Sequence, residues 1–236
     1  MEWVDEGMAA ASLRSRIRGK NPINAYARRK FSELRLRTGI YRARIDAYLA
    51  FSRELLTDPR DVGAVCPSSP YLAQAMAAEL RNVGDGLVVE LGAGTGSITR
   101  ALLQQGVAPE RLILVERSAK LAAHLRKQFP FVRVIEGDAR ELNKLLGSDA
   151  KEVKAVVSGL PLRSMSAGAV SEIVQQLKQL LTGGGILIQF TYDLRPWSVC
   201  MDTTMRRERT RLVWKNLPPA RVNTFVRATE AVQPVV

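Results

Sequence analysis

The chain has 236 residues, of which 46% are hydrophobic, and it carries a formal net charge of +12. It is long enough for one domain with a full hydrophobic core and an appendage, and none of its apolar runs approaches the ~20 residues that span a bilayer. Its two cysteines, Cys66 and Cys200, and its one histidine, His124, exclude a structural zinc site and the usual serine or cysteine triads, so no metal is expected.

The first 60 residues are predicted to form a basic helical extension. Residues 11–45 hold eleven Lys or Arg and one acid, whereas residues 46–200 hold seventeen bases and sixteen acids. Apolar residues recur every three to four positions from Ile23 to Leu34, with basic residues between them, a pattern typical of an amphipathic helix in the head-group layer of an anionic membrane. A helix docked on the enzyme body and an RNA-binding helix are the alternatives. The residues expected to contact membrane or substrate are Tyr26, Arg28, Arg29, Lys30 and Tyr41.

The very N-terminus, MEWVDEGMAAASL, carries acids where a signal peptide would be basic. The protein is therefore expected to stay in the cytoplasm, with peripheral association to the inner leaflet of the membrane.

A glycine-rich loop follows the first predicted strand, at residues 87–91. The segment reads LVVELGAGTG and places Gly92, Gly94 and Gly96 at every second position, with Glu90 two residues before the first of them. Small residues let the main chain approach a nucleotide-like ligand, and the spacing differs from the G-x-G-x-x-G of a dinucleotide site. The pattern points to S-adenosylmethionine (AdoMet), with the carboxylate accepting from its ammonium, and a purely structural turn between strand and helix is the alternative for the loop alone. The loop residues Ala93 and Thr95 complete this part of the expected site.

Two further acids lie at or just after the ends of the next two predicted strands, at residues 111–116 and 131–135. Glu116 is placed to accept from both ribose hydroxyls, the role of this position in nucleotide-binding α/β folds. Asp138 is placed to accept from the adenine amine, and Arg117 and Ala139 lie beside these acids. A solvated strand-end residue is the alternative for each acid alone, but three acids after successive strands favour one cofactor site.

The fourth predicted strand, at residues 153–157, leads into SGLPL, and the chain here resembles the bacterial phospholipid N-methyltransferases. The similarity rests on VGAVCPSS (62–69), ELGAGTGSITRALL, SGLPL (158–162) and QFTY (189–192), while the glycine-rich and EGDA elements are shared with rRNA adenine dimethyltransferases. It implies that the main chain of Ser158, Gly159 and Leu160 lines the methyl-transfer point. Tyr192, at the end of QFTY, is the residue expected to orient the amine, and an aromatic residue packed on a C-terminal hairpin is the alternative. Ser68, Ser69 and Trp197 are expected near substrate or membrane.

The order of predicted elements indicates the fold. Helices are expected at 97–105, 118–128, 140–147 and 166–181 between the strands, a fifth strand at 185–192, and a closing hairpin from strands at 211–215 and 222–227. This alternation predicts an α/β fold with a parallel sheet, the seven-stranded, Rossmann-like class I methyltransferase sheet. It is expected to occupy residues 61–236, after the helical extension.

The resemblance implies AdoMet-dependent N-methylation of phosphatidylethanolamine toward phosphatidylcholine. An rRNA or other nucleic-acid N-methyltransferase is the alternative, supported by the basic ends and the shared motifs. Leu162 argues against it, because it stands where base-methylating enzymes carry an aromatic residue that stacks on the base. A non-catalytic adaptor is a third reading, which the three acids disfavour. The expected partners are the lipid substrate and an anionic membrane surface.

Overall fold

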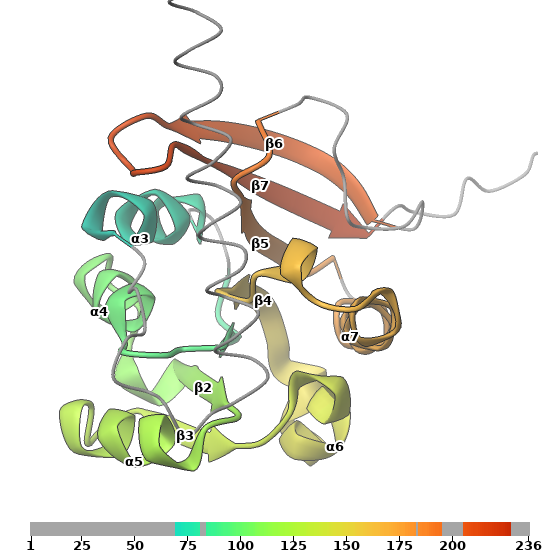
Figure 1. The fold of residues 1–236 in the computed structure, drawn as a ribbon. Helices are drawn as coiled ribbons and strands as arrows, with labels where there is room; N and C mark the ends of the chain where they lie inside the picture. The colour runs from blue at the N-terminus through green and yellow to red at the C-terminus, as the bar shows by residue number, and fades with distance from the viewer. Residues whose placement is uncertain (1–68, 81–83, 183, 195–204, 228–236) are drawn as a thin grey trace, which may run out of the picture. The chain divides into compact units, whose positions relative to one another are not determined.

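The computed structural model describes residues 69–80, 84–182, 184–194 and 205–227 (Figure 1). Within them a seven-stranded sheet has the order β3-β2-β1-β4-β5-β7-β6. The predicted class I methyltransferase fold is therefore confirmed. The predictions for residues 1–68, which include the basic extension, and the one for Trp197 lie outside the described residues.

Strands and helices alternate along the chain up to the fifth strand. The strands are β1 (Leu87–Leu91), β2 (Leu112–Glu116), β3 (Arg133–Glu136), β4 (Val153–Ser158), β5 (Ile186–Thr191), β6 (Met205–Val213) and β7 (Ala220–Arg227). The α-helices are α3 (Pro70–Ala77), α4 (Ser97–Gln104), α5 (Ala119–Gln128), α6 (Leu142–Leu146) and α7 (Ala167–Leu180). Short 3₁₀ helices include η2 (Ala78–Leu80), η4 (Ala139–Glu141) and η6 (Leu162–Ser164).

The sheet is parallel from β3 to β5 and antiparallel at its other side. β1 pairs in parallel with β2 and β4, and β5 pairs in parallel with β4. β7 then runs antiparallel to both β5 and β6. Figure 1 shows α3, α4 and α5 on one face of the sheet and α6 and α7 on the other. Helices on both faces bury the central strands, which explains why β1, β2 and β4 read as nearly continuous apolar runs.

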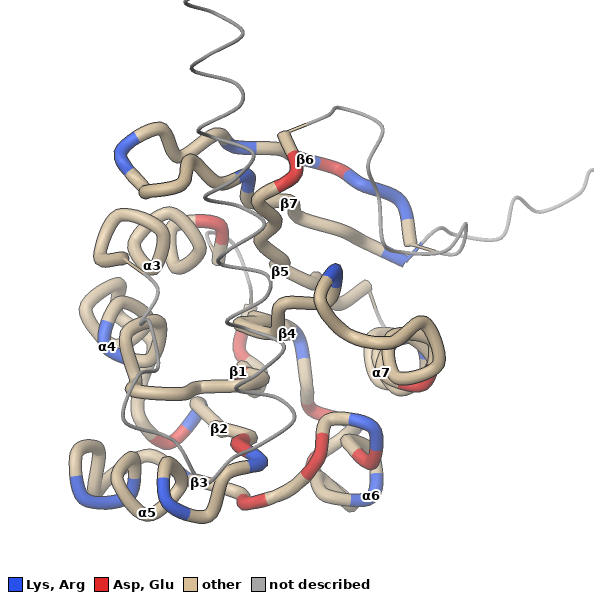
Figure 2. Tube along the Cα trace, in the orientation of Figure 1, with Lys and Arg blue, Asp and Glu red and all other residues tan. Residues whose placement is uncertain are grey.

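Most charged residues lie outside this core, although Glu79, Glu90, Glu116 and Arg221 are buried. Figure 2 shows many of the charged positions on α5, α6 and β6, while the α3 tube carries none. His124 is exposed on α5. No helix among the described residues is both long and apolar enough to cross a membrane.

Three predicted elements had the wrong bounds. The strand predicted at 211–215 runs from Met205 to Val213, and Trp214 and Lys215 belong to the turn after it. The strand predicted at 131–135 begins at Arg133, and Phe131 is 81% exposed. The helix predicted at 140–147 is one short α-helix between two 3₁₀ turns. The predicted bounds of β6 were displaced because β6 is an edge strand with an arginine-rich, mostly exposed sequence. Such a strand lacks the alternation of apolar and polar residues from which its bounds could be predicted.

Candidate functional site

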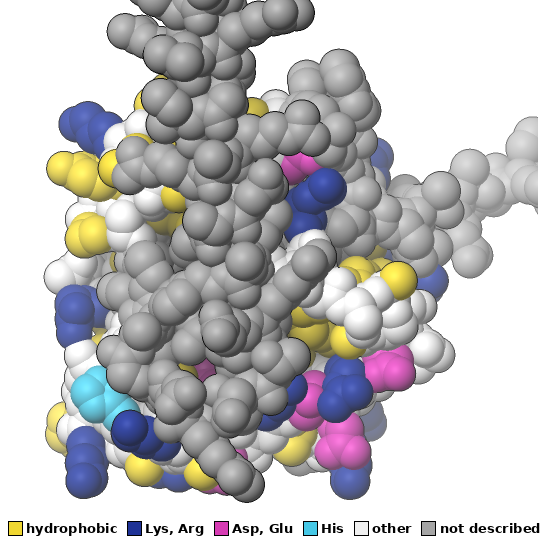
Figure 3. Space-filling model, viewed as in Figure 1, with side chains coloured by type: hydrophobic (Ala, Val, Ile, Leu, Met, Phe, Trp, Pro, Cys, Tyr) yellow, Lys and Arg dark blue, Asp and Glu magenta, His cyan; other side chains and the backbone are white. Residues whose placement is uncertain are grey.

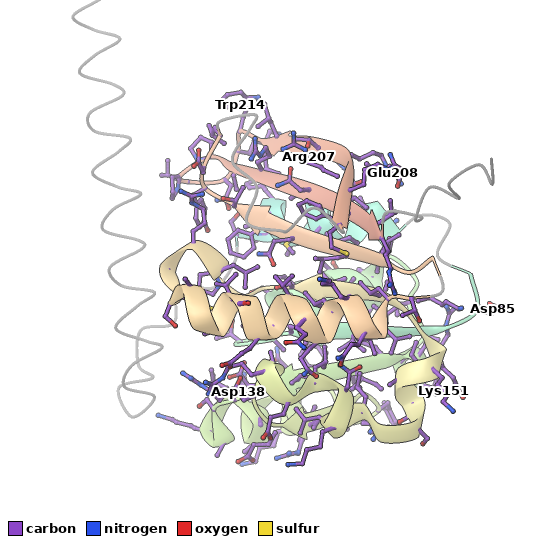
Figure 4. The ribbon with its side chains drawn as sticks, turned by 90° about the vertical axis from the view of Figure 1, so that its right-hand side faces the viewer. Asp85, Asp138, Lys151, Arg207, Glu208 and Trp214 are labelled. Atoms are coloured by element: carbon purple, nitrogen blue, oxygen red, sulfur yellow. The ribbon has the colours of Figure 1, made fainter. Side chains whose placement is uncertain are left out.

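The candidate site lies at the carboxyl edge of the sheet, where the parallel strands end. The loops that follow β1 to β5 meet there: residues 92–96, 117–118, 137–138, 159–161 and 192–194. Figure 4 shows Asp138 toward this edge, and Asp85 and Lys151, which precede β1 and β4, toward the opposite edge. Open α/β sheets bind their ligands at this edge. The topology therefore brings the predicted cofactor residues together, although they are far apart in sequence.

The glycine-rich loop is built for close approach. Gly92 and Gly96 have φ angles of +68° and +78°, in the left-handed region that favours glycine. A Cβ on Gly92 would stand 2.7 Å from Cδ2 of Leu160, and a Cβ on Gly159 would stand 2.9 Å from the Gly92 carbonyl oxygen. The loop after β1 and the loop after β4 are thus in direct contact, and each needs its glycine.

Glu90 has a buried carboxyl group, and only one of its two oxygens is hydrogen-bonded within the described part of the chain. Thr99 Oγ1 donates to Glu90 Oε2 at 2.7 Å, while Oε1 has no hydrogen-bond partner among the residues that the structure describes. Burial raises the pKa of Glu90 to about 8, against the opposing hydrogen bonds of Thr99 and with a smaller raising effect from the charge of Glu116. A buried oxygen without a hydrogen-bond partner lowers the stability of the folded protein. An incoming ammonium would satisfy it, so the site fits the methionine end of AdoMet.

Glu116 holds the glycine-rich loop in place. Its Oε2 accepts from the Gly94 N–H at 2.9 Å, and its Oε1 accepts from the Ser118 N–H at 2.9 Å. The side chain is 8% exposed, and Arg117 beside it is exposed. Each carboxylate oxygen retains a further lone pair that can accept from a ribose hydroxyl. Glu116 therefore has a structural task in addition to the predicted ribose contact.

Asp138 is held by its own neighbour. Its two carboxylate oxygens accept from the backbone N–H and the Nη2 of Arg140, each at 2.9 Å, which caps η4. Partial burial acts to raise the pKa of Asp138, but the hydrogen bonds and charge of Arg140, with a contribution from Arg117, outweigh it and hold the pKa below its ordinary value. The carboxylate is thus kept ionised as an acceptor. Ala139, which follows it, is buried in the core.

The predicted methyl-transfer loop is anchored from two sides. The Gly159 N–H donates to the Leu91 carbonyl at 2.8 Å, and the Leu160 N–H donates to Ser158 Oγ at 3.4 Å. Gln189 Nε2 on β5 donates to the Leu160 carbonyl at 2.9 Å. Gln189 is 2% exposed. Gln189 was missed as a site residue, although an amide inside the apolar strand ILIQFT was a visible signal.

Tyr192 follows β5 directly and is 6% exposed. Its ring packs edge-to-face on Phe190, with 5.4 Å between the ring centroids and 74° between the planes. The pairing of β5 with β4, which sets Gln189 opposite Ser158, brings Tyr192 to the same edge as the methyl-transfer loop. Leu162 is buried in the core cluster, so this position contributes to packing.

An ion pair that the sequence did not reveal joins the loops after β4 and β5. Arg163 Nη2 lies 3.2 Å from Asp193 Oδ2, and the Asp193 side chain is 11% exposed. Asp193 directly follows Tyr192, so this ion pair can fix the η6 turn from the neighbouring loop.

Ser69, which was expected near substrate or membrane, lies at the start of α3 and precedes the cofactor loops in sequence. Its Oγ accepts from the Leu72 N–H at 3.3 Å and hydrogen-bonds Asn216 Oδ1 in the turn between β6 and β7. It acts as the N-cap of α3. The other residues predicted to contact membrane or substrate, namely Tyr26, Arg28, Arg29, Lys30, Tyr41, Ser68 and Trp197, are outside the described residues.

Comparison with known proteins identifies related enzymes. Residues 88–185 match the family model described as a methyltransferase domain. An ornithine lipid N-methyltransferase from Singulisphaera acidiphila is 32% identical over 165 residues, which cover 67% of this chain and 85% of that protein. A ribosomal RNA small subunit methyltransferase A from Chlorobium chlorochromatii is 31% identical, but over 33% of this chain and 28% of its own length.

Solved structures agree on the fold. TrmN from Thermus thermophilus superposes with a TM-score of 0.56 at 19% identity, covering 67% of this chain and 49% of that chain. NSun6 from Pyrococcus horikoshii superposes with a TM-score of 0.52 at 14% identity, covering 70% of this chain and 53% of that chain. At these identities the likeness concerns the architecture alone, and the chain spans about half the length of each of these two structures.

Proposed function

The chain belongs to the class I AdoMet-dependent methyltransferases, in the family of the ornithine lipid N-methyltransferase, and we propose that it methylates the amine of phosphatidylethanolamine at a membrane surface. The observation that carries the assignment to a lipid amine is the extent of the similarity, whereas the choice of phosphatidylethanolamine rests on the motifs VGAVCPSS, SGLPL and QFTY. The similarity runs over 85% of the lipid enzyme but over 28% of the Chlorobium rRNA enzyme. An ornithine lipid is the second candidate substrate, because that relative is named for it.

AdoMet supplies a methyl group on a sulfonium, and the protein's task is alignment and exclusion of water. The residues that would hold it are Glu90 at the ammonium, Glu116 at the ribose and Asp138 at the adenine amine. The three acids lie at or just after the carboxyl ends of three neighbouring strands, so together they can bind both ends of one extended ligand. The geometry supports this division because Glu90 Oε1 lacks a partner, while the oxygens of the other two acids retain accepting capacity.

The acceptor amine must be neutral when it attacks, and the chain has to orient its lone pair. Tyr192 is the residue we assign to this task, since its hydroxyl oxygen can accept an N–H of the amine. Its ring face can also attract the cation that forms, an interaction worth roughly 0.5 to 2 kcal/mol. Its low exposure strengthens this attraction because little water competes. Gln189 supports the reaction indirectly by fixing the Leu160 carbonyl.

The two candidate lipids share the functional groups that this site would recognise, namely a primary amine on a flexible chain close to an anionic group. A nucleobase differs, since it is flat and needs a stacking partner worth on the order of 1 to 3 kcal/mol. The segment 158–164 contains no aromatic residue, and Leu162 is buried in the core. These features favour a lipid amine over a base.

Expression in cells that contain phosphatidylethanolamine and lack phosphatidylcholine tests the proposal. Extracted lipids should then contain methylated phosphatidylethanolamine derivatives, and a Glu90→Ala variant should produce none. Methylated ornithine lipid as the sole product, in cells that make both lipids, would assign the second candidate. Unchanged lipids with methylated rRNA would overturn the lipid assignment.

A further inference from the structure

We infer that the turn between β6 and β7, together with the first turn of α3, is a docking surface for the head-group layer of an anionic bilayer. This inference rests on the proposed function. The surface, called the hairpin patch below, consists of Tyr71, Trp214, Lys215 and Leu217.

The first observation is the exposure of large apolar side chains. Among the described residues five large hydrophobic side chains are exposed, and four of them lie in or against this hairpin. Trp214 is 67% exposed, Leu217 68% and Tyr71 50%, with Leu212 on β6 close by. In Figure 3 hydrophobic side chains gather beside a basic one at the upper left, over α3 and the hairpin. Concentrated apolar exposure marks an interaction surface, whereas scattered single residues do not.

The second observation is the position of the hairpin patch. The pairing of Thr191 with Arg221 and of Val213 with Ala220 places the β6–β7 turn at the carboxyl end of β5. This is the edge that carries the candidate site, and Figure 4 shows Trp214 toward the same side as Asp138. The fifth exposed residue, Phe131, precedes β3 and so lies at the opposite edge. A membrane that contacts the hairpin patch would therefore lie at the edge of the sheet that carries the catalytic loops.

The third observation is that the turn is held rigidly. Asn216, 3% exposed, hydrogen-bonds Ser69 at the start of α3 and donates from Nδ2 to the Pro218 carbonyl at 2.6 Å. The Asn216 N–H also donates to the Val213 carbonyl at 3.2 Å. The buried amide fixes the backbone on which Trp214 and Leu217 are displayed. Trp214 and Leu217 are therefore exposed on a turn whose backbone conformation is fixed by hydrogen bonds.

The chemistry of the hairpin patch selects a lipid head-group layer. Tryptophan and tyrosine prefer the membrane–water interface because one end of the ring is apolar and the other polar. Lys215 Nζ lies 5.5 Å from the centroid of the Tyr71 ring and is exposed, so its charge sits beside the aromatic surface. Arg211 adds a second exposed charge. Apolar side chains would enter the interface while the charges meet lipid phosphates.

Vesicle binding of the full-length protein tests this inference without requiring catalysis. The probe is a sedimentation assay with vesicles of phosphatidylglycerol and phosphatidylethanolamine at low salt. The double variant Trp214→Ser/Leu217→Ser should bind at least tenfold more weakly, since two apolar side chains no longer leave water. Phe131→Ser is the control because it removes a large, even more exposed apolar side chain from the opposite edge, and it should bind as the unchanged protein does. Equal binding of the double variant would overturn the inference.

A second measurement reports on Trp214 directly. The chain has three tryptophans, so Trp3→Phe/Trp197→Phe leaves Trp214 as the sole fluorophore. Its emission should be quenched by vesicles that contain brominated acyl chains. Binding without quenching would show that another segment contacts the membrane and would overturn the inference. So would a dimer in solution that the double variant dissociates, because the hairpin patch would then bind a second copy.

Folding and function are checked separately. Unchanged AdoMet affinity and thermal midpoint would establish that the double variant is folded. Because neither vesicle assay contains a methylation step, failure of the proposed lipid methylation would leave both results intact. Conversely, a protein that methylates lipids but binds vesicles without the hairpin patch would refute this inference alone.

Discussion

Replacement of Glu90 by glutamine should abolish a proton release that accompanies AdoMet binding. In the structure Glu90 is fully buried and its pKa is raised to about 8, with burial as the main cause. At neutral pH the carboxyl group is therefore mostly protonated. An ammonium placed at the unpaired Oε1 favours the ionised form and lowers the pKa. Binding should drive the proton into solution.

The magnitude follows from the pKa of about 8. If the bound form is fully ionised, binding should release about 1 proton at both pH 5.5 and pH 6.5. AdoMet affinity should rise about tenfold between these pH values, about 1.4 kcal/mol. The range stays more than one pH unit below about pH 8, where an α-amino group of the cofactor would itself titrate.

Titration calorimetry in two buffers of different ionisation enthalpy measures the released proton directly. The unchanged protein should give heats that depend on the buffer, whereas Glu90→Gln should give heats that do not, with an affinity that is flat over the same pH range. Buffer-independent heats for the unchanged protein would refute the placement of the ammonium at Glu90. Proton release that persists in Glu90→Gln would assign it to another group.

The raised pKa also makes stability depend on pH. The folded protein keeps a proton on Glu90 that the unfolded chain loses near pH 4.5, so its contribution is complete below that pH and is lost as the pH rises through about 8. The difference is on the order of 5 kcal/mol over this range. Denaturant unfolding of the AdoMet-free protein should show a smaller decline for Glu90→Gln. Identical pH profiles for the two proteins would contradict the raised pKa.

Three further predictions test other parts of the site. Glu116→Ala should weaken AdoMet binding at least tenfold, about 1.4 kcal/mol or more, because it removes the ribose contacts and frees the Gly94 loop; unchanged affinity by calorimetry would remove Glu116 from the site. Tyr192→Phe should lower kcat and kcat/KM together with AdoMet affinity almost unchanged, and full activity would leave only the ring with a role. Changing Arg28, Arg29 and Lys30 to Glu should weaken binding to anionic vesicles and make the remainder less sensitive to salt; unaffected binding would exclude the basic extension as a membrane contact.

The parts of the fold that were predictable from sequence are those encoded locally. The glycine spacing at 92–96 and the acids at 90, 116 and 138 each lie within a few residues of a strand end. Their meeting at one edge follows from parallel pairing, so a correct fold class was enough to bring them together. The helix expected at 118–128 is likewise confirmed as α5, which Ser118 caps by accepting from the Leu121 N–H at 3.4 Å.

The contacts that were missed join residues far apart in sequence. Gln189 meets Leu160 across 29 positions, and Arg163 meets Asp193 across the two loops that β4 and β5 end in. No periodicity encodes such pairs, because the side chains come together only after the strands have paired. The hairpin patch was missed because Trp214 was predicted to lie in a strand at 211–215, where its side chain could have packed against the core. In the structure Trp214 lies in the turn after β6 and is exposed to solvent.

Methyl transfer by the purified protein tests the central claim most directly. AdoMet with a labelled methyl group is offered with vesicles of phosphatidylethanolamine, with vesicles of ornithine lipid, and with ribosomal RNA, each alone and all together. The account predicts label in the amine of a lipid, with none in RNA, and loss of that label in Glu90→Ala. Label in RNA, or no transfer to either lipid by a protein that binds AdoMet, would contradict it.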